Sequence, residues 1–273
     1  MRVAIIGANG QLGMDLMKAF GDLDTVPLNH GDIEISDMDS VSRVLSLMKP
    51  AVIVNTAAYH KVDDCEKNPE RSFQVNAIGA LNLARVAQDL KSELVHISTD
   101  YVFDGKKAQP YVETDLPRPL NVYAASKVAG EHFIAAYSER HYVVRSSGLY
   151  GHNKCRAKGR NFIDTMLALA RDGKEIRVVQ DQVRELVKTG SCGRYHATNN
   201  GECSWYEFAG EIFKNAGLKP NVQPVSAKQF PSPIKRPSYS VLDNAALRPL
   251  GIEKMPHWKE SLEHYFKNKP LGN

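Results

Sequence analysis

A glycine-rich segment near the N-terminus constrains the fold more than any other feature of this sequence. Gly7, Gly10 and Gly13 follow the apolar run Val3–Ile6, and a helical pattern begins at Gln11. Glycine permits a tight turn and a close approach of the backbone to a pyrophosphate, and free N–H groups at a helix start attract phosphate charge. The segment therefore predicts a strand–loop–helix unit that binds a dinucleotide.

Three glycines alone are a weak signal, because ordinary turns between a strand and a helix also contain them. Here the glycines lie close to the N-terminus and between a strand pattern and a helix pattern, which favours the functional interpretation. We expect six residues of the loop and the first helical turn to contact the cofactor: Gly7, Asn9, Gly10, Gln11, Leu12 and Gly13.

Short apolar runs alternate with amphipathic stretches through the first half of the chain. Strands are expected at 25–28, 51–54 and 94–97, and helices at 37–48 and 69–90. The proline at position 27 suggests that its strand lies at a sheet edge. Apolar strands that alternate with helices predict an α/β fold, a Rossmann-type doubly wound parallel sheet whose ligands bind beyond the carboxyl ends of the strands.

The pattern loosens beyond about residue 150, where prolines cluster at 220–237 and a helix is expected at 205–217. A chain of 273 residues is near the size at which a single core divides. We therefore expect a dinucleotide-binding Rossmann domain at 1–150. A smaller C-terminal lobe at 151–273 would mainly bind substrate, with some elements able to return to the first domain.

Composition excludes several classes of function. The net charge of +4, from 35 basic and 31 acidic residues, is too small to indicate a nucleic-acid partner. The four cysteines are scattered without a CxxC pair, and the nine histidines show no zinc-like spacing, so no metal site is predicted. No apolar run is long enough for a signal peptide or a membrane span. We expect a cytoplasmic protein.

The tip of the second strand should report which dinucleotide binds, because an acid there holds a ribose hydroxyl and an arginine accommodates a 2′-phosphate. The sequence has Asn29 at this point and an acid, Asp32, only three residues later. Both NADH and NADPH therefore stay open.

Tyr123 and Lys127 form the strongest candidate for proton chemistry. They are four residues apart and share one face of an expected helix. A nearby ammonium should lower the pKa of the phenol and prepare it for acid–base catalysis. A buried tyrosine with a lysine reaching to solvent would give the same pattern.

The same spacing recurs at Tyr150 and at Tyr265, so position must separate the three pairs. Only Tyr123 begins a helical pattern that follows a strand ending in Ser98 and Thr99. The Thr99 hydroxyl can donate to the same substrate oxygen. We therefore expect Tyr123, Lys127 and Thr99 to be catalytic.

Four segments together resemble the extended short-chain dehydrogenase/reductases, and within them the dTDP-4-dehydrorhamnose reductase branch. These are Gly7–Gly13, Ala57–Tyr59, Ser98–Phe103 and Tyr123–Lys127. The run from Ser98 to Gly105 and the late segment Arg236-Pro237 with Ser240 and Leu242 are typical of that branch. The resemblance covers nearly the whole chain.

The resemblance implies reduction of the 4-keto group of dTDP-4-dehydro-L-rhamnose by NADPH or NADH. It implies that Tyr123 is the proton donor, with Lys127 as its partner, and that Thr99 and Asp100 contact the sugar. It assigns further cofactor contacts to Asp32, Ile33, Ala57, Ala58 and Tyr59. Some members bind Mg²⁺ and form homodimers, which the resemblance allows here without assigning a metal ligand.

The chain departs from the branch at two places. Gly148 stands where a tryptophan usually lines the sugar pocket, which removes one wall of that pocket. After Val183 about a dozen residues of the usual pattern are absent before Arg184, more than short connections ordinarily vary. The lobe is either shortened, or the sequence lacks a segment of the natural chain. Because loss of most of a packed helix would expose core, we favour the second explanation.

Two other classes of function stay open from the sequence. A nucleotide-sugar epimerase or dehydratase would use tightly held NAD⁺ and a second acid–base pair, and no Asp-Glu pair follows Thr99. A non-catalytic NADP-binding regulatory subunit would not need Thr99, Tyr123 and Lys127 together. Net consumption of reduced cofactor would separate a reductase from both.

Overall fold

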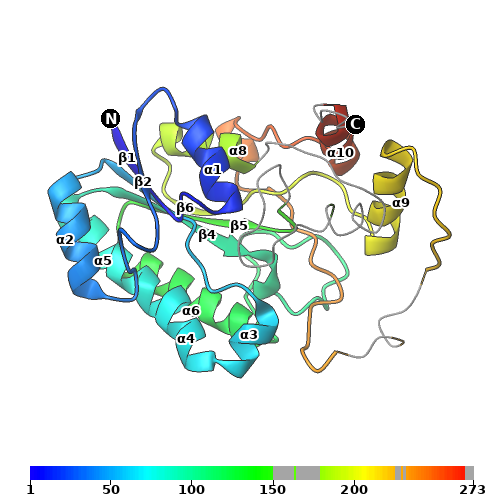
Figure 1. The fold of residues 1–273 in the computed structure, drawn as a ribbon, viewed down its shortest axis with the longest axis horizontal. Coiled ribbons are helices and arrows are strands. Elements are labelled where there is room, and N and C mark those ends of the chain that lie inside the picture. The colour runs from blue at the N-terminus through cyan, green and yellow to red at the C-terminus, as the bar shows by residue number, and fades with distance from the viewer. Residues whose placement is uncertain (150–162, 164–178, 225–228, 230–231, 268–273) are drawn as a thin grey trace.

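A parallel β-sheet forms the centre of the molecule (Figure 1). The computed structural model describes residues 1–149, 163, 179–224, 229 and 232–267. Within them the sheet has the strand order β2-β1-β3-β4-β5-β6, with every pairing parallel. The strands are β1 (Arg2–Ile6), β2 (Asp24–Leu28), β3 (Val52–Asn55), β4 (Glu93–Thr99), β5 (His141–Ser146) and β6 (Gly193–His196). The predicted Rossmann-type fold and the edge position of β2 are confirmed.

Helices cover both faces of the sheet. In Figure 1, α1 and α8 lie on one face, and α2, α5 and α6 lie on the other. The helices are α1 (Gln11–Ala19), α2 (Met38–Met48), α3 (Val62–Lys67), α4 (Pro69–Phe73), α5 (Gly79–Leu90), α6 (Val122–Tyr137), α8 (Val179–Thr189), α9 (Trp205–Asn215) and α10 (Trp258–Lys267). No helix among the described residues is long and apolar enough to cross a membrane.

The side chains of β1 point alternately to the two faces of the sheet, and helices cover both faces. This explains why the sequence of β1 is a continuous apolar run. Val3 and Ile5 pack in a core with residues of α1 and α8. Ala4 and Ile6 pack in a second core with residues of α2 and α5. Because both faces are buried, neither set of positions can be polar.

The helix expected over 69–90 is confirmed in extent but is interrupted. A π-helical turn, Gln74–Ile78, separates α4 from α5. Gly130 of α6 packs directly against this turn, since a Cβ built on Gly130 would lie 2.3 Å from the Asn76 carbonyl oxygen. Single π-turns of this kind often occur at functional sites. A π-turn contains one residue more than an α-helical turn, and the hydrophobic pattern of the sequence does not predict that extra residue.

Helix α8 changes the interpretation of the junction after Val183. The helix continues through Val183 and Arg184, and it buries Val179, Leu186 and Val187 on the α1 side of the sheet. Its Arg184 donates to the Asp22 carboxylate at 2.6 Å. The residues present therefore cover this part of the core.

Candidate active site

The glycine loop after β1 forms a cradle that side chains would fill. Gly7 has φ +79°, and a Cβ there would lie 2.6 Å from the Thr56 hydroxyl oxygen. A Cβ on Gly13 would lie 2.1 Å from the Gly7 carbonyl oxygen, so the third glycine permits close packing of helix on strand. Gly10 begins α1 without a side-chain cap. The loop and helix start therefore fit a dinucleotide pyrophosphate.

The tip of β2 braces the glycine loop. The Asn29 side-chain oxygen accepts from the Asn9 amide at 3.0 Å, and Asp32 accepts from the Asn29 amide at 2.8 Å. Ile33 is buried in the core between the sheet and α2. His30 is exposed and lies 3.4 Å from the Glu34 carboxylate. One Asp32 oxygen is thus used in the turn itself.

The segment after β3 lies beside the glycine loop, because β1 pairs with both β2 and β3 and the strand order reverses there. Thr56 donates to the Ile6 carbonyl at 2.8 Å. The Ala57 amide donates to the Asn55 side chain at 3.1 Å. This reversal is where doubly wound sheets bind their ligands. The predicted residues Ala57, Ala58 and Tyr59 follow directly.

Asn76, in the π-turn, connects this segment to α6. Its amide accepts from the Tyr59 N–H and donates to the Tyr59 carbonyl, both at 2.9 Å. It also donates to Ser126 at 3.0 Å, and Ser126 donates to the Tyr123 carbonyl at 2.8 Å. The backbone beside the glycine loop and the helix that carries Tyr123 are therefore held by one buried network.

Tyr123 lies in the first turn of α6, where Asn121 caps the helix by accepting from the Ala124 amide at 2.9 Å. The Thr99 side chain, which comes from the end of β4, lies near the Tyr123 hydroxyl and acts to lower its pKa. The structure thus brings together two of the three predicted catalytic residues. It also provides an oxygen pair that could contact one substrate oxygen.

The expectation that Lys127 lowers the pKa of Tyr123 is wrong for this structure. Burial raises the pKa of Tyr123 above its ordinary value, and Thr99 opposes this only partly. The Lys127 Nζ lies 2.9 Å from the His96 Nε2 and 2.7 Å from the Ile97 carbonyl oxygen. Burial lowers the pKa of Lys127 to about 8. Helical spacing placed both side chains on α6 but did not reveal these partners.

Asp100 provides a buried carboxyl group beside Thr99. Its side chain accepts from the Thr99 hydroxyl at 3.1 Å and lies near Ser240. Burial raises the pKa of Asp100 to about 6, although both of these neighbours act in the opposite direction. Asp100 can therefore exchange a proton near neutral pH.

The late segment around Arg236–Leu242 packs against the segment that follows β4. Ser238 donates to the Gly105 carbonyl at 3.1 Å, and a Cβ on Gly105 (φ +75°) would lie 2.6 Å from the Ser238 amide. The Tyr111 amide donates to the Val241 carbonyl at 2.9 Å. The segments Ser98–Gly105 and Arg236–Leu242, which both carry the family resemblance, are therefore in contact.

Gly148 follows β5 and lines a pocket with Gln11 and Leu12 of the dinucleotide loop. It has φ +49°, and a Cβ there would meet nothing within 4 Å among the atoms placed around it. The pocket also contains Ser147 and Thr198. The space where the family's tryptophan was expected is thus open in the described part of the chain. The competing pair Tyr150 and Lys154 lies outside the described residues.

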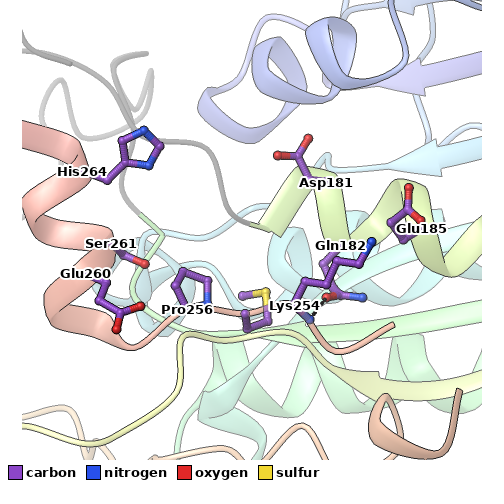
Figure 2. Close-up of a pocket in the computed structure, with 9 residues that line it drawn as sticks. Asp181, Gln182, Glu185, Lys254, Pro256, Glu260, Ser261 and His264 are labelled. Carbon is purple, nitrogen blue, oxygen red and sulfur yellow. Dashed lines mark hydrogen bonds between the residues drawn. The ribbon is translucent and has the colours of Figure 1, made fainter. Parts of the chain in front are cut away.

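Another pocket, of about 490 Å³, lies between α8 and α10 (Figure 2). Asp181 and Glu185 line it from α8, and Glu260 and His264 line it from α10. None of the residues predicted for catalysis or cofactor binding is among those that line it. Size alone therefore does not mark the reaction site.

Comparisons with known proteins agree with this geometry. The family model described as RmlD substrate binding domain matches residues 1–270. Spore coat polysaccharide biosynthesis protein SpsK of Bacillus subtilis (strain 168) is 36% identical, with 98% of each chain covered. dTDP-4-keto-6-deoxy-D-glucose reductase of Streptomyces niveus is 34% identical, with 100% of this chain and 98% of the relative covered.

A solved structure has the same fold over almost the whole chain. The crystal structure of dTDP-4-dehydrorhamnose reductase from Bacillus anthracis str. Ames in complex with NADP has a TM-score of 0.90 and 39% identity, covering 97% of this chain and 98% of that chain. The alignment with SpsK has 282 positions, whereas 98% of 273 residues is about 268, so about 14 positions are gaps in this chain. This agrees with a chain shorter than its relatives. The chain belongs to the RmlD substrate-binding-domain family, the family of the dTDP-4-dehydrorhamnose reductases.

Proposed function

We propose that the protein reduces the 4-keto group of dTDP-4-dehydro-L-rhamnose to give dTDP-L-rhamnose, with NADPH or NADH as the reductant. The observation that carries the proposal is the position of Tyr123 beside Thr99 at the carboxyl end of β4, with the helix of Tyr123 joined to the segment beside the glycine loop through Asn76. The relatives named above support the choice of substrate and cofactor.

The chain's own residues can perform the proton step. A nicotinamide bound in the cradle supplies hydride to C4 of the sugar. Tyr123 delivers its hydroxyl proton to the alkoxide oxygen, and its raised pKa keeps it protonated until that strong base forms. Thr99 donates to the same oxygen and steadies its charge. Lys127 holds the nicotinamide ribose and influences Tyr123 through that contact.

The cofactor contacts follow the cradle and its surroundings. Gly7 and Gly13 permit the tight turn and the close packing of helix on strand, and Asn9, Gly10, Gln11 and Leu12 supply the loop and the helix start around the pyrophosphate. We assign Asp32 and Ile33 to contacts with the adenine, and Ala57, Ala58 and Tyr59 to contacts with the ribose and phosphates, as the family resemblance implies. Either NADPH or NADH suits this arrangement, and NADP is the cofactor in the solved B. anthracis relative.

The substrate is proposed to lie between the strand ends and the C-terminal lobe, mainly formed by residues 151–273. Asp100 contacts the sugar beside Thr99, and the open space at Gly148 borders the sugar pocket. We further propose a cytoplasmic enzyme, in keeping with its scattered cysteines, that can form a homodimer as other family members do.

A specific observation favours a second substrate. The S. niveus relative is named for dTDP-4-keto-6-deoxy-D-glucose, and Gly148 removes a wall that would restrict the sugar. The alternative is therefore a reductase of this other 4-keto sugar. It would use the same Tyr123 and Thr99 chemistry, so only the substrate separates the two.

Incubation of the purified protein with NADPH and each dTDP-4-keto sugar, monitored by nicotinamide absorbance and by NMR of the product, tests the proposal. We expect stoichiometric NADPH oxidation and dTDP-L-rhamnose from the first sugar. Faster turnover of the 6-deoxy-D-glucose substrate would support the alternative. Isomerised product without net oxidation would indicate an epimerase, and cofactor binding without turnover of either sugar would indicate a regulatory subunit.

A further inference from the structure

A buried chain of polar side chains connects Lys127 to the end of β3. His96 lies in the middle of β4 and is only 1% exposed. Its Nδ1 lies 3.0 Å from the Asn55 amide nitrogen, and its Nε2 lies 2.9 Å from the Lys127 Nζ. Both contacts are buried, so the protein alone arranges the hydrogens between these three side chains.

The orientation of Asn55 determines the tautomer of His96. The side-chain oxygen of Asn55 accepts from the Ala57 N–H at 3.1 Å, so its amide nitrogen is the atom that faces His96. An amide nitrogen only donates, and Nδ1 of His96 must therefore accept. A neutral imidazole whose Nδ1 accepts carries its proton on Nε2.

This tautomer constrains Lys127. The Nε2–H bond of His96 points at the Lys127 Nζ, and only the neutral amine has a lone pair to accept it. The amine also donates one N–H to the Ile97 carbonyl at 2.7 Å. Burial lowers the pKa values of both His96 and Lys127, that of Lys127 to about 8, so burial shifts both groups toward their neutral forms. The charge of Glu131, one turn further along α6, raises the pKa of Lys127 and so opposes the effect of burial.

We propose that His96 is a positioning residue for Lys127, which it holds as a neutral amine by donating its Nε2–H. Uptake of a proton by Lys127 removes the lone pair and so frees Nζ from His96. The position and the protonation state of Lys127 are therefore coupled through β4. The functional importance of this coupling rests on the role proposed for Lys127 above, but the tautomer and the pKa do not.

The tautomer can be measured without turnover. In ¹⁵N NMR of histidine-labelled protein, the resonance lost in His96→Gln belongs to His96. We expect a neutral ring protonated on Nε2, with an unprotonated Nδ1. A ring protonated on Nδ1, or a charged ring at pH 7, would overturn the proposal.

The coupling can be measured by NMR titration of the lysine ¹³Cε resonances, with Lys127 identified by its loss in Lys127→Arg. We expect His96→Leu to raise the pKa of Lys127 by about one pH unit, because the neutral amine loses its donor. His96→Gln, whose amide nitrogen can replace Nε2–H, should restore the original pKa. His132→Gln on the exposed face of α6 is the matched control and should change nothing.

An unchanged Lys127 pKa in His96→Leu would contradict the proposal, even if that variant were less stable or less active. If His96→Leu does not fold, the wild-type tautomer and the titration of His96→Gln still decide the question. Loss of reductase activity in the wild type would refute the proposed function alone, because both NMR results stand without substrate.

Discussion

Thr99 shows how one side chain can join a strand, a turn and a catalytic group. Its hydroxyl oxygen accepts from the Tyr101 amide at 3.2 Å and so caps the short 3₁₀ turn that follows β4. The same hydroxyl donates to the Asp100 carboxylate at 3.1 Å and lies near the Tyr123 hydroxyl. Position and orientation of the proposed proton donor thus depend on a residue at the sheet's carboxyl edge.

Replacement of Thr99 by valine keeps the shape and removes the hydroxyl. We predict a fall in kcat of about a hundredfold, since a donor to the developing alkoxide is lost. Stability should fall by only about 1 kcal/mol, the usual cost of a lost cap. Steady-state kinetics and urea unfolding measure the two effects. The exposed Thr114→Val variant is the control, and equal effects in the two variants would contradict the assignment.

Asp100 makes stability depend on pH in a direction opposite to that of most carboxyls. Its folded pKa of about 6 exceeds the ordinary 3.8, so the folded state holds the proton more tightly. Its contribution to stability is present below pH 3.8 and is lost as pH rises to about 6.

Asp100→Asn removes this dependence. The unfolding free energy of the variant minus that of the wild type should therefore increase between pH 4 and pH 7, by up to about 3 kcal/mol at 1.36 kcal/mol per pH unit. Urea unfolding of both proteins at the two pH values measures it. A difference that stays constant with pH would show that Asp100 is not protonated in the folded state.

At this scale the sequence could identify residues that follow strand ends but not those inside strands. Thr99 and Tyr123 stood out because each begins a new element at the edge where ligands bind. His96 lies within the run Leu94–Ile97, where a single polar residue reads as part of a strand. The direction of the Tyr123 pKa could not be predicted, because it depends on burial and on where Lys127 points.

Helix α6 and the π-turn Gln74–Ile78 pack so closely that no side chain fits between them at Gly130. Gly130 permits this contact, because any side chain there would meet the Asn76 carbonyl. Since Asn76 also holds Tyr59 and Ser126, displacement of the turn would disturb both the cofactor segment and the helix of Tyr123.

Gly130→Ala should accordingly reduce the free energy of unfolding by about 1–3 kcal/mol through overpacking against backbone. Gly210 of α9 is a matched control, because no atom lies within 4 Å of a Cβ built there. Gly210→Ala should raise stability by about 0.5–1 kcal/mol, the usual gain in a helix interior. Denaturant unfolding compares them. A neutral effect of Gly130→Ala would show that the turn relaxes without cost.

Elements with a strong local signal were predicted closely, and the others were not. Asp37 begins the helix expected at 37–48, and it caps α2 by accepting from the Asp39 and Ser40 amides. Gly217 ends the range expected for α9 and has the left-handed φ of +68°. The acidic stretch at 62–67 forms α3, and the π-turn interrupts the helix at 74–78, because tertiary contacts decide both.

At the scale of the whole molecule, the site is assembled from segments far apart in the chain. The glycine loop, the segment after β3, the end of β4 and the start of α6 meet at one edge of the sheet. The late segment around Arg236–Leu242 reaches the same region through Ser240 and Asp100. Topology rules predict that the segments after neighbouring strands meet at one sheet edge. The position of the late segment depends on a long connection that no local sequence pattern describes.

The central claim is that Tyr123 donates the proton in a reduction that consumes NADPH. Its most direct test is the single-turnover rate of NADPH oxidation with dTDP-4-dehydro-L-rhamnose for Tyr123→Phe. The control is Tyr137→Phe, the same change on the exposed face of the same helix. We predict a rate reduced by about 10²- to 10⁴-fold in Tyr123→Phe, with NADPH affinity unchanged, and a normal rate in Tyr137→Phe. A near-normal rate in Tyr123→Phe would contradict the account.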